Sequence, residues 1–192
     1  MAAISLKGGE ILSRKLGEIA KKLGTKHQIS VGFMSNARYD NGTYVAMVAA
    51  IHNYGAPAAG IPARPFFTNM VQDQKSTWGP KLGHLLKKEG FSAQNALQAL
   101  GEDIGGELRE SIIHGNWADL SEITLMLRTM RSQDQGLSVT GKTVGQAAAL
   151  ISAGKKHNRT KTGSAPLIDT GYMLNSVSYQ IDDEESRRVV DA

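Results

Sequence analysis

The chain has 192 residues and a formal net charge of +4, with 41% hydrophobic and 21% charged residues. These values are ordinary for a globular protein and allow one domain with a sizeable core. Because the chain has no cysteine, disulfides and thiolate metal sites are excluded. No apolar run is long enough to span a bilayer and no signal sequence is apparent, so we expect synthesis in the cytoplasm and no membrane partner.

Apolar periodicity predicts a helix, a strand and a second helix in the first part of the chain. Residues 9–24 carry apolar side chains at helical spacing, whereas residues 27–34 alternate between apolar and polar as a strand does. A short helical pattern begins at Tyr44 and stops at Gly55. The three prolines of 56–65 then predict an extended, stiff loop.

Two longer helices are predicted next. The first begins at Phe66, and Pro80 should break or restart it near Gly79. Ser92 is a good N-cap for the second helix, 93–114, which has the clearest apolar stripe in the chain. The residues of this stripe are Leu97, Leu100, Ile104, Leu108 and Ile112.

The segment 116–163 differs in character and is predicted to be an excursion from the core, mobile in part until it docks on a partner. It contains a predicted helix at 121–131, with Ser121 as N-cap, and a small Ala-rich helix around 143–153. The basic polar stretch 155–164 completes the excursion.

The chain then regains a regular pattern. A helical turn is predicted at 172–174, where Asp169 or Thr170 should cap the turn and Leu174 should face the core. The alternation of residues 177–181 predicts a second strand that can pair with the first.

These elements together predict an α+β fold, in which a small antiparallel sheet carries helices packed on one face. We expect one domain over residues 1–181, with 116–163 as an extended insertion. Residues 182–192 are expected to form a disordered tail.

Two segments of this chain are similar to a known group of proteins. The first runs from Tyr44 through His52-Asn53-Tyr54-Gly55 to Ile61-Pro62-Ala63-Arg64-Pro65-Phe66-Phe67, and the second from Pro166-Leu167-Ile168-Asp169-Thr170-Gly171 to Val177. Their order resembles the neck, tail-completion and virion-morphogenesis families of tailed bacteriophages. The resemblance covers 27–114 and 165–181 but not 116–163. Many relatives have an acidic residue where this chain has Asn53, so an ion pair made there does not carry over.

The resemblance implies a structural subunit of the virion, at the neck or tail end, that joins head connector and tail without catalysing a reaction. Its implied partners are other copies in a ring around the DNA channel, the head-closure or connector proteins, and the tail terminator or tail tube. In this setting Arg64 could make bidentate contacts and Phe66 and Phe67 could anchor the stiff loop on a partner. The alternative is that both phenylalanines belong to the core and Arg64 to the surface.

Charged clusters allow a second interpretation. A basic cluster with possible contacts to DNA phosphates consists of Lys155, Lys156, Arg159 and Lys161, and an acidic run consists of Asp182, Asp183, Glu184 and Glu185. Opposite charges on one subunit suit head-to-tail contacts between copies. The basic cluster also leaves open a non-specific nucleic-acid-binding protein, and an assembly chaperone is a further alternative.

Residues 136–143 match the phosphate-binding pattern G-x-x-x-x-G-K-[ST] in full, which makes a nucleotide-binding enzyme a distant third hypothesis. However, the preceding residues are polar, where such a loop follows a buried strand, and too few residues follow to build the required sheet. The five histidines are dispersed without metal-ligand spacing. We therefore predict no catalytic residue, cofactor or metal.

Overall fold

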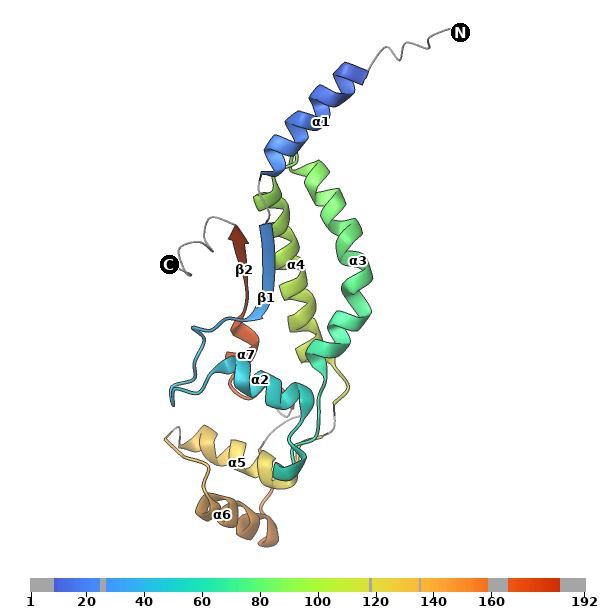
Figure 1. The fold of residues 1–192 in the computed structure, drawn as a ribbon. Coiled ribbons are helices and arrows are strands. Elements are labelled where there is room, and N and C mark those ends of the chain that lie inside the picture. The colour runs from blue at the N-terminus through green and yellow to red at the C-terminus, as the bar shows by residue number, and fades with distance from the viewer. Residues whose placement is uncertain (1–8, 25–26, 118, 135, 159–165, 184–192) are drawn as a thin grey trace, which may run out of the picture.

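The computed structural model describes residues 9–24, 27–117, 119–134, 136–158 and 166–183. The fold is α+β, as predicted (Figure 1). In chain order its elements are α1 (Gly9–Leu23), β1 (His27–Phe33), α2 (Val45–Tyr54), the 3-10 turn η1 (Pro57–Ala59), α3 (Phe66–Lys88), α4 (Ala93–His114), α5 (Glu122–Gln133), α6 (Gly141–Ser152), α7 (Tyr172–Asn175) and β2 (Val177–Asp183).

The two predicted strands form one antiparallel sheet, in which Ile29 lies opposite Ile181 and Phe33 opposite Val177. Helix α4 packs along both strands. This approach depends on Gly101, since a Cβ at that position would lie 2.6 Å from the Ile29 side chain and 2.8 Å from the ring of Tyr179. The sheet therefore has one helix-covered face, and α4 can lie close to it because Gly101 has no side chain.

Strand β2 is longer than the sequence predicted. Asp182 and Asp183 pair with Gln28 and His27, so the expected tail does not begin at residue 182. The backbone of β1 extends β2 by pairing with these two residues, and two consecutive aspartates do not indicate a strand in the sequence. The rest of the acidic run, at 184–185, lies outside the described residues.

Helix α3 runs unbroken through Pro80, and the break predicted near Gly79 is wrong. Contacts on both sides of the proline hold the helix against α4. The Trp78 indole donates to Glu107 at 2.8 Å, and Lys81 donates to Asp103 and Glu107, both at 2.6 Å. Tertiary packing thus offsets the cost of one missing backbone hydrogen bond, and the helix bows along its length (Figure 1).

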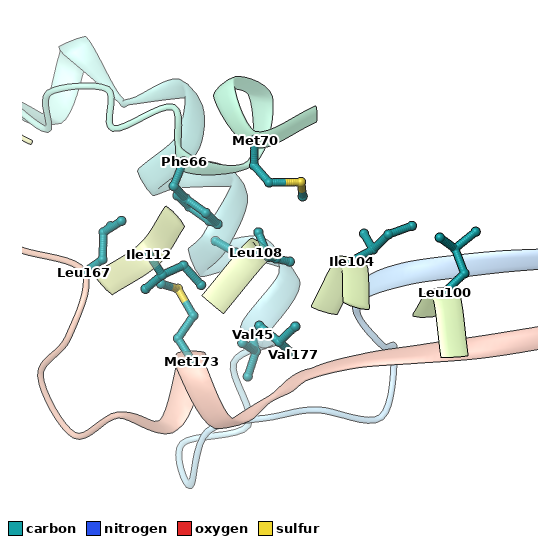
Figure 2. Packing of buried hydrophobic residues seen from close by; sticks show 11 residues of the cluster. Val45, Phe66, Met70, Leu100, Ile104, Leu108, Ile112, Leu167, Met173 and Val177 are labelled. Carbon is teal, nitrogen blue, oxygen red and sulfur yellow. The ribbon is translucent and has the colours of Figure 1, made fainter. Parts of the chain in front are cut away.

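The core lies where α2, α3, α4, α7 and β2 meet (Figure 2). Its largest fully buried side chains are Phe66, Leu108, Ile112 and Val45. Each stabilises the fold by about 1.5–3 kcal/mol through burial. The stripe predicted on 93–114 is buried in full, and the Ser92 hydroxyl accepts from the backbone of Asn95 as a helix cap.

Helices α5 and α6 pack on each other at the end of the molecule opposite α1 (Figure 1). The Ser121 side chain caps α5, as predicted, by accepting from the Thr124 backbone at 3.2 Å. Helix α6 begins at Gly141, two residues before the predicted start, because Thr140 and Thr143 form a reciprocal capping box. The buried side chains of this pair are Leu125, Met126, Thr129 and Ala147.

Candidate interaction site

Asn53 joins the end of α2 to the start of α3. Its side-chain carbonyl accepts from the backbone of Phe67 at 3.0 Å and of Thr68 at 3.2 Å, and its amide donates to the Thr68 hydroxyl at 2.8 Å. These are N–H groups of the first turn of α3, which have no partner within the helix. The buried Asn53 side chain, at the end of α2, therefore caps the N-terminus of α3. An uncharged amide is enough for this role, and no ion pair is needed.

The loop between α2 and α3 folds back on itself and on α2. Ala56 and Ile61 form an isolated bridge, and the Arg64 backbone donates to the His52 carbonyl at 2.7 Å. Gly55 has a φ of 75°, and a Cβ there would lie 2.8 Å from the backbone nitrogen of Ala63. The loop is therefore defined, as predicted, but it contains the turn η1 and is not extended throughout.

Two of the residues expected to reach a partner from this loop are inside the protein. Phe66 is fully buried, and its backbone carbonyl accepts from the Ser111 hydroxyl at 2.8 Å. Arg64 is only 4% exposed. Phe67 is half-buried and packs against the core. In this structure Phe66 and Arg64 are not surface anchors: Phe66 belongs to the core cluster, and Arg64 is buried next to the end of α2.

The surface that this region does present is the outer side of α2. Tyr44, Met47 and Tyr54 are 43%, 52% and 74% exposed, and Ala46 and Ala50 are exposed beside them. The sequence of α2 has no Asp, Glu, Lys or Arg. A helix that is apolar on all sides is usually covered on all sides. The sequence does carry a signal for this surface, since residues 45–54 contain no charged side chain. Apolar periodicity alone did not predict that one side of this helix is exposed.

The second segment of the resemblance is held by two arginines of α5. Arg128 donates to the backbone carbonyls of Ile168 at 3.0 Å and Pro166 at 3.1 Å, and its Nε lies 3.3 Å from Asp169. Arg131 lies 3.0 Å from the other carboxylate oxygen of Asp169. Asp169 is thus an ion-pair partner of α5 and not the cap of α7.

The turn α7 is positioned by its own backbone and by Tyr172. Thr170 accepts weakly from the Tyr172 backbone at 3.3 Å, while the position before the helix is Gly171 in the left-handed conformation. The Tyr172 hydroxyl donates to the Arg38 carbonyl at 2.7 Å. Met173 is buried and Leu174 packs partly against the core, so the apolar side of this turn lies as predicted.

His52 lies in a small cavity between the two segments, together with Arg128 and Leu167. Burial lowers the pKa of His52, and the positive charges of Arg64 and Arg128 lower it further. The same surroundings raise the pKa of Tyr39, through burial first and then through Tyr172 and Asp169. The neutral form of His52 is therefore favoured in the fold.

The phosphate-loop pattern at 136–143 does not have the geometry of a phosphate cradle. Helix α5 precedes it where a strand is required. The Thr140 and Thr143 hydroxyls each accept from the other's backbone N–H, at 3.3 and 2.8 Å, and the Thr143 hydroxyl lies 3.1 Å from the Ser138 carbonyl. The Thr143 hydroxyl, which would bind magnesium in such a loop, is already used to start α6, so we assign no nucleotide site here.

Of the four basic residues predicted to contact phosphates, the structure describes two. Lys155 and Lys156 are exposed just after α6, whereas Arg159 and Lys161 lie outside the described residues. Within the described ranges, no three His, Asp or Glu side chains are grouped so that they could hold a metal ion. None of the helices in those ranges is both long and apolar enough to cross a bilayer.

Comparisons of the chain with protein-family models, with curated proteins and with solved structures find no match.

Proposed function

We propose that this protein is a structural subunit of a tailed-phage virion, located at the neck or tail end, which joins head and tail by protein contacts in a ring of copies. The observation that carries the proposal is that the two segments of the resemblance, 44–67 and 166–177, pack on each other. Val45, Ala49 and Phe66 share one buried cluster with Leu167, Met173 and Val177.

The chemistry of the assembled region supports a binding role. Its contacts are caps and backbone hydrogen bonds that position the α2–α3 junction, and one ion-pair group that holds residues 166–169 on α5. The outer side of α2 then offers aromatic and methionine side chains, which are enriched in the centres of protein interfaces. We assign this side of α2 to contact with a neighbouring virion protein.

The proposal is tested by mass spectrometry of purified particles of the phage that encodes the chain. It predicts peptides of this chain in mature particles, and their absence would contradict it. A second test replaces Met47 and Tyr54 by glutamate, which should leave heads and tails formed but unjoined because two charges would enter the apolar contact. Gln94→Glu adds a charge at an exposed position of α4 and serves as the control.

A further inference from the structure

A long groove runs between α3 and α4, on a different side of the helix pair from the sheet. On the sheet side, Ile29 and Val31 of β1 line a smaller cavity with Leu100 and Ile104. Apart from Met70, which lines both, the groove is lined by other residues of the same two helices, and it has apolar side chains in its floor. These apolar residues are Met70, Leu85 and Ala99.

The rim of the groove is acidic. Five carboxylates line it against a single lysine, Lys81, which pairs with Asp103 and Glu107. The carboxylates are Asp73, Glu102, Asp103, Glu107 and Glu110. An occupant of this groove should therefore be apolar on one side and basic on its flanks.

Helix α1 has those properties. Leu16 is 56% exposed and lies on one stripe with Ile19 and Leu23. Over 13–23 the remaining exposed charges are four basic residues and one acidic residue, Glu18. The basic residues are Arg14, Lys15, Lys21 and Lys22. In Figure 1, α1 points away from the rest of the fold; Leu16 of this stripe is exposed, and Ile19 and Leu23 are partly exposed.

We propose that α1 of one copy docks in the α3–α4 groove of a second copy, with its leucine stripe on the groove floor and its basic flanks along the acidic rim. This names the contact between copies in the ring proposed above, and it rests on that proposed function only for its biological setting. Because each subunit gives one surface and receives on another, the contact is head-to-tail and can close a ring.

The dimensions of the two surfaces agree. The groove is lined from Ala99 to His114 on α4, about 22 Å at 1.5 Å per residue. Helix α1 has 15 residues and is also about 22 Å long. A third helix of this length can therefore lie along the whole groove.

A second copy is the favoured occupant over the subunit's own α1. Only residues 24–26 connect α1 to β1, and three residues span about 10 Å when fully extended. That is about the diameter of one helix, whereas β1 and the groove lie on different sides of the α3–α4 pair. The groove of a neighbour can be reached without crossing this pair.

Gly106 offers a test that leaves the core untouched. It lines the groove, and a Cβ there would meet no atom within 4 Å. Gly106→Leu should fill the groove and weaken association of the full chain about tenfold or more, measured by light scattering after size exclusion. Gly83→Leu is the matched control, since Gly83 is an exposed α3 glycine outside the groove with equally open space around it. Circular dichroism should show both variants folded.

The complementary variant is Leu16→Glu on α1, which places a carboxylate on the stripe and should weaken association of the full chain to a similar extent. Mixed one to one, the two variants should form a dimer and nothing larger. The Leu16→Glu protein keeps its groove and the Gly106→Leu protein keeps its α1, so a single intact contact is available. Higher salt should dissociate this dimer.

The inference is overturned if the unmodified chain is monomeric, if both variants still associate, or if the mixture fails to pair. Fold-back of α1 into its own groove would give monomers in every sample. These outcomes are independent of the place in the virion: a chain that is found in particles but does not self-associate keeps its assignment to the virion and loses this contact. A chain that associates through this contact but is absent from particles keeps the contact and loses the virion role.

Discussion

The central part of the molecule and the α5–α6 pair are held by different forces. The centre is an apolar cluster that joins segments distant in sequence, from Val45 to Val177. The α5–α6 pair has a few buried side chains of its own, and Arg128 and Arg131 attach it to residues 166–169 by polar contacts. Apolar burial fixes the fold, whereas the polar attachment fixes where α5 and α6 lie on it.

The largest expected effect is in the centre. Leu108 is fully buried, so Leu108→Ala should lower the free energy of unfolding by about 2–5 kcal/mol. Leu125→Ala makes the same change inside the α5–α6 pair. We expect it to lower the hydrogen-exchange protection of α5 and α6 more than it lowers the midpoint of the main unfolding transition in urea. Equal loss of the main transition in both variants would show that the two regions unfold as one unit.

Arg128 tests the attachment itself. Arg128→Gln removes the hydrogen bonds to Pro166 and Ile168 and one contact with Asp169. We expect a cost of about 1–3 kcal/mol, seen in hydrogen exchange as faster exchange in 122–133 and 166–175. Arg131 is more exposed, so Arg131→Gln should cost no more than about 1 kcal/mol. Unchanged exchange in the Arg128 variant would contradict a polar attachment.

Alanine substitutions at two glycines of α4 should change the stability by smaller amounts and in opposite directions. Gly101→Ala would push a methyl group into Ile29 and Tyr179 and should cost about 1–3 kcal/mol. Gly106→Ala meets open space and should stabilise the helix by up to about 1 kcal/mol. Thermal unfolding of both variants measures the difference, and a destabilised Gly106→Ala protein would mean that the α4 surface is not as open as described.

The smallest expected effect on stability is that of pH, and it comes from His52, which lies beside Arg128 between the two regions. Because the pKa of His52 is lowered in the fold, the unfolded chain takes up this proton first as the pH falls. The stability that neutral His52 contributes is present above its ordinary pKa of about 6.5 and is lost progressively below it. His52→Gln should therefore flatten the fall in melting temperature below pH 6.5. Arg128→Gln should flatten it in part, and identical pH profiles would contradict this account.

Local signals predicted much of the fold. Ser92 and Ser121 cap helices as their positions indicated, and the stripe on 93–114 is buried. The break at Pro80 was wrong because contacts 22 to 29 residues apart in sequence hold α3 to α4. Such tertiary contacts have no local signature.

The candidate site was predicted less well. Arg64 and Phe66 were expected to be contact residues, but both are buried: Phe66 belongs to the core cluster, and the backbone of Arg64 bonds to α2. The cap made by Asn53 and the pair of Arg131 with Asp169 join residues 14 to 38 positions apart. Sequence spacing identifies the residue types but not which of them meet.

Imaging the head–tail junction of the intact particle tests the central claim most directly. The account predicts a ring of density at the neck or tail end into which α2, α3 and α4 of this chain fit, with the outer side of α2 against another virion protein. A junction fully accounted for by other chains, with no copy of this one, would contradict it.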